Sequence, residues 1–214
     1  MRAVIFANGE LKDPALARAA LQTGDLIIAA DGGGRHCLSL GIGPAVVIGD
    51  FDSLTAKELN HFKAQGAEII QHPTHKDETD LELALLYAAE RGAKEILVLG
   101  ALGGRLDMTL SNFLLTAHAK LRQQKISFLA GKQRVYPVYH QVQVEGRPGD
   151  VVSLIPIGGD VTGVTTQGLE YPLNAETLHF GSTRGISNVL LGHTAEVTIQ
   201  SGMLLCIVLA QPVD

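Results

Sequence analysis

The 214-residue chain has no tryptophan, only two cysteines, and no apolar run near the ~18 residues that a membrane-spanning helix needs. Cys37 and Cys206 lie in unrelated sequence contexts, which argues against a disulfide framework and favours a reducing compartment. The amino terminus turns polar too early for a signal peptide. We therefore expect a cytoplasmic protein that does not partner a membrane.

Basic residues are also scarce, and none of them form a run. The chain has 17 Lys and Arg against 22 Asp and Glu, a net charge of −5, which argues against general binding to nucleic acid. Residues 135–214 contain Arg147 and Arg184 but no lysine. Because this change in composition indicates a domain boundary, we expect one domain at 1–130 and a second at 131–214.

The first domain alternates short apolar runs with helical patterns. We expect strands at 4–7, 26–30, 46–48, 69–70, 96–99 and 126–129. Helices are expected to start at Pro14, after Thr55 and after Thr79, and a further helix is expected to run from Arg105 to about Arg122. Nearly continuous apolar strands between helices predict a mostly parallel α/β sheet covered on both faces.

The second domain shows no long helical pattern. Its alternating and buried-type runs, separated by Gly and Pro, predict a small antiparallel β-sandwich. We expect its last two strands, 194–200 and 203–209, to form a hairpin that turns at Ser201-Gly202. The predicted fold is therefore an α/β domain followed by an all-β domain.

Charged residues of the first domain gather at the carboxyl ends of its predicted strands, where open α/β sheets bind ligands. They are Asp31, Asp50, Asp52, Asp77, Asp80, Arg105 and Asp107. Bare carboxylates at close range repel one another, and a bound divalent cation removes that repulsion. A site made of carboxylates alone favours Mg²⁺, which commonly completes its shell with substrate phosphates. The pattern therefore suggests a Mg²⁺–nucleotide site.

Each of these groups also has a purely structural interpretation. Asp31-Gly32-Gly33-Gly34 is compatible with a tight turn, and Thr79 with Asp80 is compatible with a helix cap. Gly103-Gly104-Arg105 is either a loop before a helix or a phosphate clamp. None of the glycine stretches matches a Walker A loop or a dinucleotide fingerprint, which argues against those two nucleotide-binding classes.

The second domain has one concentrated polar patch, at residues 180–188. It holds Arg184, one of the two cations of residues 135–214, among hydroxyls, an amide and two glycines. The patch is either a polar loop or part of a ligand site. The histidines show no metal-ligand spacing.

Five motifs occur in an order that resembles the thiamin pyrophosphokinase (thiamin diphosphokinase) family. They are Ala30-Asp31-Gly32-Gly33, Gly49-Asp50-Phe51-Asp52-Ser53, Lys76-Asp77-Glu78-Thr79-Asp80, Gly103-Gly104-Arg105-Leu106-Asp107 and Ser182-Thr183-Arg184-Gly185-Ile186-Ser187-Asn188. The resemblance implies transfer of pyrophosphate from ATP to thiamine, which yields thiamine diphosphate and AMP. It also implies a homodimer, with ATP bound and turned over by the α/β domain and thiamine bound by the β-sandwich.

The resemblance further implies roles for individual residues. Mg²⁺ would be held by Asp50, Asp52 and Asp80. The nucleotide and phosphate pocket would be lined by Asp31, Asp77, Thr79, Arg105 and Asp107. Thiamine would be contacted by Ser187 and Asn188, with Arg184 beside them. Asp50, Asp52, Asp80, Arg105 and Asp107 would form the catalytic set, and we expect either Asp80 or Asp107 to receive the hydroxyl proton.

Two features of the chain depart from the family pattern. Met108 stands where the family often has a histidine or another polar residue, and the chain has no tryptophan to stack on thiamine. Tyr171 or Phe180 would then supply the stacking. These departures leave open a pyrophosphokinase that acts on a pterin alcohol, or a module that binds nucleotide or thiamine without turnover.

Overall fold

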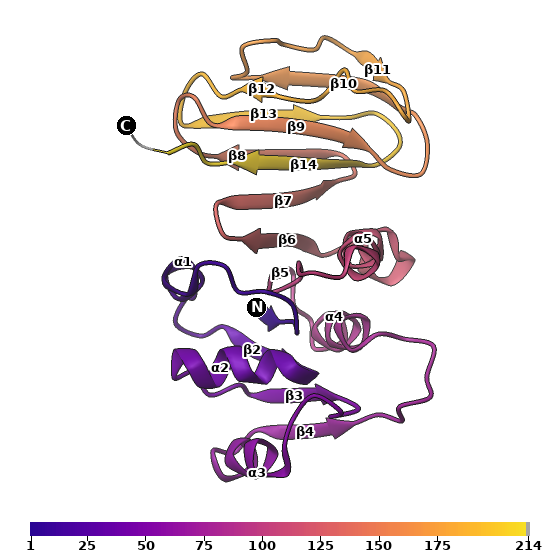
Figure 1. The fold of residues 1–214 in the computed structure, drawn as a ribbon. Helices are drawn as coiled ribbons and strands as arrows, with labels where there is room; N and C mark the ends of the chain where they lie inside the picture. Colours follow the sequence, from indigo (N-terminus) through magenta and orange to yellow (C-terminus); the bar gives the residue numbers. More distant parts are fainter. Residues whose placement is uncertain (213–214) are drawn as a thin grey trace. The chain divides into compact units, whose positions relative to one another are not determined.

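The computed structural model describes residues 1–212 and divides the chain into two compact units (Figure 1). The first is Met1–Gly131, and the second begins at Lys132. None of the helices in residues 1–212 combines the length and apolar character of a membrane span.

The first unit is built on a parallel sheet with helices on it (Figure 1). Its strands are β1 (Arg2–Phe6), β2 (Leu26–Ala30), β3 (Val46–Gly49), β4 (Glu68–Gln71), β5 (Glu95–Leu99) and β6 (Lys125–Ala130). They lie in the order β6-β5-β1-β2-β3-β4, and neighbouring strands run parallel. Its helices are α1 (Pro14–Ala19), α2 (Gly34–Leu40), α3 (Ala56–Ala64), α4 (Asp80–Glu90) and α5 (Leu106–Leu114).

The central strand β1 of this sheet is buried on both faces, whereas the edge strand β4 is partly exposed. Val4, Ile5 and Phe6 of β1 are fully buried, and alternation along the strand points Ile5 away from its two neighbours. Val4 and Phe6 join a core that includes Cys37 from α2 and Phe62 from α3. Helix α4 packs against β1, β2 and β3. The predicted mostly parallel α/β sheet is confirmed.

The helix starts follow the predicted capping residues. Thr55 Oγ1 accepts a hydrogen bond from the backbone N–H of Glu58 at 3.3 Å, and the Glu58 carboxylate accepts one from the Thr55 N–H at 2.7 Å. Thr79 Oγ1 accepts a hydrogen bond from the Glu82 N–H at 3.2 Å. These bonds satisfy amides that have no partner inside the helix, and so they fix where α3 and α4 begin.

The helix predicted to reach Arg122 ends earlier than expected. Two short 3₁₀ turns, Leu115–Ala117 and Ala119–Leu121, follow α5. The Thr116 hydroxyl donates to a backbone carbonyl three residues earlier at 2.6 Å, and His118 is extended, with its ring accepting from a backbone amide two residues later. These local side-chain bonds compete with the α-helical ladder, which is why the prediction was wrong here.

The second unit is an antiparallel β-sandwich. Its strands are β7 (Gln133–Val138), β8 (Gln141–Glu145), β9 (Val151–Pro156), β10 (Val161–Gln167), β11 (Glu176–Leu178), β12 (Asn188–Val189), β13 (Thr194–Thr198) and β14 (Leu204–Leu209). One sheet has the order β12-β9-β14-β7, and the other has the order β11-β10-β13-β8. Leu154 and Cys206 of the first sheet share a buried core with Val144 and Val197 of the second. The predicted sandwich is confirmed.

The predicted hairpin at Ser201-Gly202 is wrong. Strand β13 pairs with β8 and β10, whereas β14 pairs with β7 and β9, so the connection crosses from one sheet to the other. Each of the two strands has buried residues that face the core of the sandwich. They can face each other across that core when the strands lie in opposite sheets. Gly202 makes the crossing possible: its φ is 93°, and a Cβ there would lie 2.8 Å from the Asp160 carbonyl oxygen.

Candidate active site

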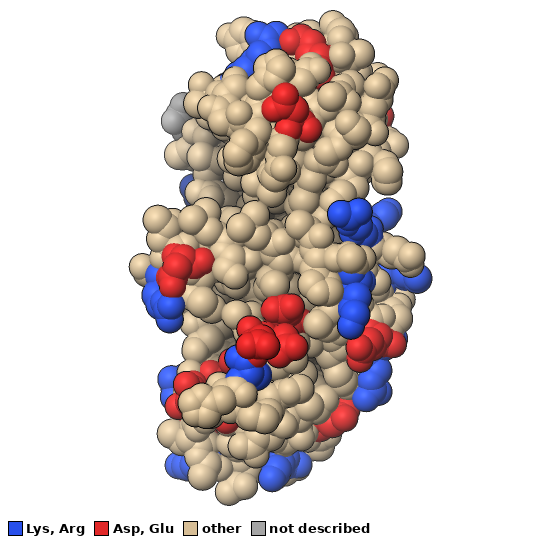
Figure 2. Space-filling model, turned by 90° about the vertical axis from the view of Figure 1, so that its right-hand side faces the viewer, with Lys and Arg blue, Asp and Glu red and all other residues tan. Residues whose placement is uncertain are grey.

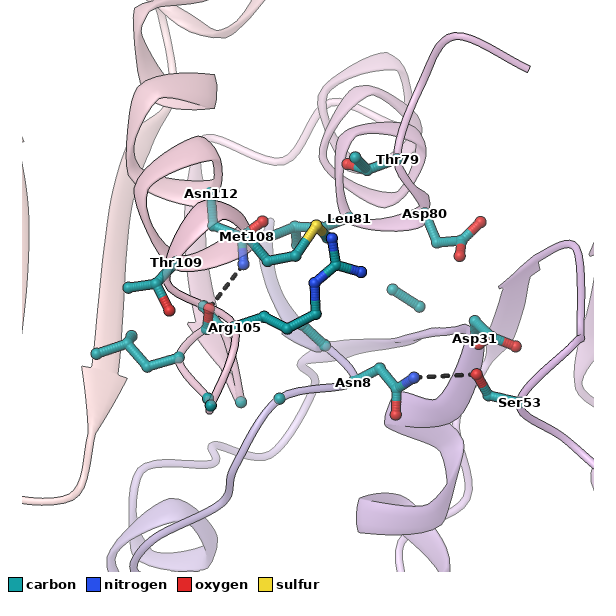
Figure 3. A pocket seen from close by; sticks show the side chains of 18 of the residues that line it. Asn8, Asp31, Ser53, Thr79, Asp80, Leu81, Arg105, Met108, Thr109 and Asn112 are labelled. Atoms are coloured by element: carbon teal, nitrogen blue, oxygen red, sulfur yellow. Dashed lines mark hydrogen bonds between the residues drawn. The ribbon is translucent and has the colours of Figure 1, made fainter. Parts of the chain in front are cut away.

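A pocket of about 310 Å³ opens at the carboxyl ends of strands in the first unit (Figure 3). Its walls come from the segments after β1, β2, β3 and β5 and from the starts of α4 and α5. The lining residues lie at 7–9, 30–31, 52–53, 79–81, 100–105, 108–109 and 112. In Figure 3, Asp31 and Asp80 lie on one side of the pocket, and Arg105, Met108 and Asn112 lie on the other.

Three carboxylates converge on the acidic side. Oxygen atoms of Asp31, Asp50 and Asp52 all lie within 4.8 Å of one another. In the register of the sheet, Ala30 of β2 stands beside Ile48 of β3, so the residues that follow the two strands are neighbours. Figure 2 shows acidic side chains gathered with a basic one in a hollow of the molecular surface. A group of hard oxygen donors this close suits Mg²⁺.

Asp31 is the most constrained of the three carboxylates. Its side chain is 97% buried, its φ is +43°, and its buried Oδ1 has no hydrogen-bond partner. Left-handed backbone and an unsatisfied buried oxygen are both unfavourable, and such features concentrate at ligand sites. The unpaired Oδ1 of Asp31, next to two other carboxylates, is a suitable ligand for a cation.

Gly49 allows Asp31 and Asp80 to approach each other. A Cβ at Gly49 would lie 2.9 Å from the Asp31 Cβ and 3.2 Å from the Asp80 Cγ. Any larger residue would push these two side chains apart. The family resemblance implies Asp50, Asp52 and Asp80 as the metal ligands, whereas the geometry groups Asp31 with Asp50 and Asp52. Asp80 stands next to this group, and its role as a metal ligand remains a prediction.

Lys76 reaches into the carboxylates from the loop between β4 and α4. Its Nζ lies 3.3 Å from Asp50 Oδ2 and 3.1 Å from Asp80 Oδ1. Burial would lower the pKa of Lys76, but the nearby carboxylates of Asp80 and Asp50 raise it. The backbone N–H of Asp52 is the main factor that lowers the pKa of Asp50, despite some burial, and Lys76 adds to it. Burial raises the pKa of Asp80, with Lys76 opposing that rise.

The predicted residues at the start of α5 are far more exposed. Arg105 Nε lies 3.2 Å from Asp107 Oδ1, and both side chains are largely in solvent. Hydrogen bonds from Arg105 lower the pKa of Asp107. Arg105 lines the pocket, and Figure 3 shows its side chain extending along the wall beside Met108. Asp77 is exposed in the loop that carries Lys76.

Sequence reasoning missed four polar residues that line this pocket: Asn8, Ser53, Thr109 and Asn112. Asn8 Nδ2 donates to Ser53 Oγ at 3.1 Å, and Ser53 donates to Asp52 at 2.9 Å, so together they orient that carboxylate. Asn112 is 94% buried: its Nδ2 donates to the Ala101 carbonyl at 2.6 Å, and its Oδ1 has no partner. The residues at 105, 108, 109 and 112 share one helical face, a spacing that points to Asn112.

In the second unit, the predicted residues have local partners. Arg184 Nε lies 3.0 Å from a Glu176 carboxylate oxygen. Asn188 Oδ1 accepts from the Tyr171 N–H at 3.0 Å, and its Nδ2 donates to the Tyr171 carbonyl at 2.7 Å. The Asn188 amide is therefore engaged in holding the backbone of Tyr171. Ser187 has a left-handed φ of 62°, and its N–H donates to a serine hydroxyl on β9.

The two aromatic residues expected to replace tryptophan are both accessible. Tyr171 is 62% exposed, and Phe180 is 61% exposed. The Phe180 N–H donates to Asp160 Oδ1 at 2.8 Å, which fixes the backbone beneath that ring. An exposed ring on a fixed backbone is suited to stack on a flat ligand.

Two family models match the chain, one in each unit. The model described as "Thiamin pyrophosphokinase, catalytic domain" matches residues 17–128, and the model described as "Thiamin pyrophosphokinase, vitamin B1 binding domain" matches residues 139–204.

Individual proteins are similar over most of the chain. "Thiamine pyrophosphokinase" of Bacillus subtilis (strain 168) is 31% identical over 185 residues, which are 85% of this chain and 86% of that protein. "Thiamine pyrophosphokinase 1" of Oryza sativa subsp. japonica is 30% identical over 75% of this chain, and the match spans only 64% of the rice protein. The crystal structure of the enzyme of that name from Bacillus subtilis has a TM-score of 0.87 at 29% identity, and the alignment covers 99% of this chain and 100% of that one.

Proposed function

We propose a function from the premise that this chain belongs to the thiamin pyrophosphokinase family: it transfers pyrophosphate from ATP to the hydroxyl of thiamine, forming thiamine diphosphate and AMP. The observation that carries the proposal is the convergence of Asp31, Asp50 and Asp52 at a pocket, which Asp31 and Asp52 line together with Arg105. Oxygen donors for a cation on one side and a guanidinium on the other suit a metal-bound triphosphate.

We assign ATP binding and catalysis to residues 1–130 and thiamine binding to residues 131–214. The acidic pocket and its arginine belong to the first unit, and the exposed aromatic residues belong to the second. The separate matches to a catalytic and a vitamin B1 binding model support this division.

The acidic group fits a magnesium ion. Oxygen atoms of Asp31, Asp50 and Asp52 lie close together, and the buried Oδ1 of Asp31 lacks any other partner. When bound there, Mg²⁺ would neutralise charge on the nucleotide phosphates. Ser53 and Asn8 keep the Asp52 carboxylate oriented toward the pocket by their chain of hydrogen bonds.

In the reaction, the hydroxyl oxygen of thiamine attacks the β-phosphorus of ATP. A new P–O bond forms, the bond from that phosphorus to the α–β bridging oxygen breaks, and AMP leaves with the electron pair. The chain provides positioning and charge stabilisation, as is usual for phosphoryl-type transfer. Arg105 stabilises charge on the phosphate oxygens, and a carboxylate receives the hydroxyl proton.

Asp80 is better suited than Asp107 to receive that proton. Asp107 is paired with Arg105 in solvent, which lowers its pKa and makes it a weak base. Asp80 lines the pocket and is half-buried, and that burial raises its pKa. A carboxylate with a raised pKa holds a proton more strongly, and so it is the better proton acceptor.

The pH dependence of the rate tests this assignment. Because the pKa of Asp80 is raised, kcat/KM should fall as the pH drops through a value above the 3.8 of an ordinary aspartate. Asp80→Asn should lower kcat by about 10²–10⁴-fold and remove this acidic limb from the residual activity. Asp107→Asn should keep the limb. A variant of Asp80 that retains the wild-type profile would contradict the assignment.

Thiamine is proposed to bind at the exposed patch of the second unit. Tyr171 or Phe180 stacks on the flat rings of thiamine, and Ser187 contacts the pyrimidine. Asn188 contributes by holding the Tyr171 backbone through two hydrogen bonds. The paired carboxylate of Glu176 keeps Arg184 in place beside this surface.

Product analysis tests the function directly. Purified protein incubated with ATP, Mg²⁺ and thiamine should release AMP and thiamine diphosphate in equal amounts. A parallel reaction with a pterin alcohol should release no AMP. AMP formed only in the parallel reaction would show that the acceptor is a pterin, and no AMP in either would show a binding module without turnover.

We also propose that the chain is a homodimer. Leu106, Leu110 and Leu114 recur every four residues along one face of α5, and they are 69%, 54% and 51% exposed. Burying such a face supports association. Light scattering should give twice the 22.7 kDa chain mass for the wild type and a single chain mass for Leu110→Glu. Leu191→Glu, at a leucine that is 60% exposed in the second unit, is the matched control. A wild-type mass of one chain would contradict the dimer.

The proposal keeps the expected cytoplasmic location. Cys37 and Cys206 are both free and buried, which is compatible with a reducing compartment. Burial raises the pKa of each thiol to about 12, so neither is a nucleophile at neutral pH.

A further inference from the structure

Lys76 is a nearly buried cation inside the proposed metal site. Its side chain is 11% exposed, and its ammonium bridges Asp50 at 3.3 Å and Asp80 at 3.1 Å. It comes from the loop between β4 and α4, which lies outside any helix or strand. The contact with Asp80 lacks hydrogen-bond geometry, because Asp80 Oδ1 has no hydrogen-bond partner. Lys76 Nζ donates a hydrogen bond to Asp50 Oδ2, whereas only charge holds it to Asp80.

A divalent cation and the Lys76 ammonium compete for the same carboxylates. Asp50 belongs to the group of carboxylates that suits the metal, and the same residue pairs with the ammonium. Without a ligand, the lysine offsets part of the repulsion among Asp31, Asp50, Asp52 and Asp80. Once a doubly charged ion sits on these oxygens, a second cation beside it is repelled.

We propose that Lys76 is a counter-cation that exchanges partners: it bridges Asp50 and Asp80 in the nucleotide-free protein and binds the ATP phosphates when a metal ion takes the carboxylates. The proposal rests on the proposed function of this pocket. A lysine has a flexible four-carbon stem and a charge that suits phosphate, so the displaced ammonium has an anion to bind within reach of its own loop. The exchange also releases Asp80 from its ion pair.

The exchange makes metal and nucleotide bind cooperatively. Metal alone must displace the ammonium without compensation, whereas metal together with nucleotide provides the ammonium with a new partner. Because coupling between two ligands is reciprocal, each should raise the affinity for the other. Removing the charge of Lys76 should therefore tighten metal binding in the absence of nucleotide and weaken nucleotide binding in the presence of metal.

The experiment measures binding rather than turnover. Mn²⁺ is titrated into the protein and followed by electron paramagnetic resonance, with and without α,β-methylene ATP. In this analogue a methylene group replaces the α–β bridging oxygen, so the bond that the reaction cleaves is absent. For Lys76→Met, Mn²⁺ alone should bind about 3–10-fold more tightly than to wild type, and the analogue should bind at least about tenfold more weakly. Lys76→Arg should keep the wild-type order of affinities. Lys57→Met, at an exposed lysine on α3, is the matched control and should change neither.

The binding measurements can contradict the proposed exchange of partners by Lys76. Mn²⁺ affinity that is unchanged or weaker in Lys76→Met overturns the exchange, as does unchanged affinity for the analogue. If thermal melting shows that Lys76→Met does not fold, Lys76→Gln is measured in the same way. Wild-type protein that binds neither Mn²⁺ nor the analogue overturns the proposed function itself, which distinguishes that failure from the failure of the exchange alone.

Discussion

Replacing Asp50 by asparagine is expected to lower kcat/KM for pyrophosphate transfer by about 10²–10³-fold while the protein stays folded. Asp50 contributes an anionic oxygen to the group it forms with Asp31 and Asp52. Asparagine has the same size but no charge, so the substitution isolates the electrostatic contribution. Losing one charge of three weakens the hold on a divalent cation and leaves the phosphate charge less neutralised in the transition state.

The local structure should tolerate this change. Asp50 Oδ1 accepts a hydrogen bond from the Asp52 N–H at 3.2 Å, and the amide oxygen of asparagine can accept the same bond. What is lost is the pairing of Lys76 with the second carboxylate oxygen. Lys76 retains Asp80 at 3.1 Å, so its ammonium keeps one partner.

Steady-state kinetics at several Mg²⁺ concentrations provide the measurement. The variant should need more Mg²⁺ for half-maximal rate, with part of the loss recovered at high metal concentration. Glu68→Gln is the matched control, because Glu68 also pairs with a cation, Arg91, at 3.2 Å but lies on β4 outside the pocket lining. Activity of Asp50→Asn within a few-fold of that control would contradict the role assigned to the carboxylate group.

The strands and the helix starts of the first unit could be predicted because local chemistry determines them. The run Leu26–Ala30 is apolar throughout, and a turn sequence follows it directly. Thr55 caps its helix through bonds within four residues of chain. The carboxyl ends of parallel strands share one edge of the sheet, so the convergence of Asp31 with Asp50 follows from the topology.

Other features depend on contacts that the sequence does not encode locally. The order of β13 and β14 is decided by which sheet buries each strand, and a short connection containing glycine resembles a hairpin turn. Lys76 lies four residues before Asp80, a spacing that hints at their pairing, but its contact with Asp50 depends on how a loop folds back. The bonds from Asn188 to Tyr171 likewise join residues 17 apart in sequence.

Replacing Asp31 by asparagine is expected to stabilise the ligand-free protein and to abolish most of its activity. The Asp31 carboxylate is 97% buried, one of its oxygens has no partner, and two other carboxylates lie nearby. Removing its charge removes both the desolvation cost and the repulsion, a gain of about 1–2 kcal/mol. Asparagine also accepts the left-handed φ of +43° at this position.

Asp150 is the matched control, because it is equally buried but fully satisfied. It is 96% buried, and its two oxygens accept backbone hydrogen bonds from Arg147 at 2.8 Å and Gln211 at 2.9 Å. Asparagine there would direct an N–H₂ group at a backbone N–H, so Asp150→Asn should destabilise the protein by about 1–3 kcal/mol. Burial is nearly the same in both cases, whereas the groups around the two carboxylates differ.

Calorimetry of the metal-free protein measures the two effects. A change of about 1 kcal/mol moves Tm by about 2–4 °C in a chain of this size, so Asp31→Asn should melt higher than wild type and Asp150→Asn lower. With Mg²⁺ and α,β-methylene ATP in excess, the order of wild type and Asp31→Asn should reverse, because only the wild type gains stability from the bound ligands. A metal-free Tm at or below that of wild type would mean that the buried carboxylate has a stabilising partner. The unpaired charge of Asp31 would then not destabilise the ligand-free protein, contrary to the prediction.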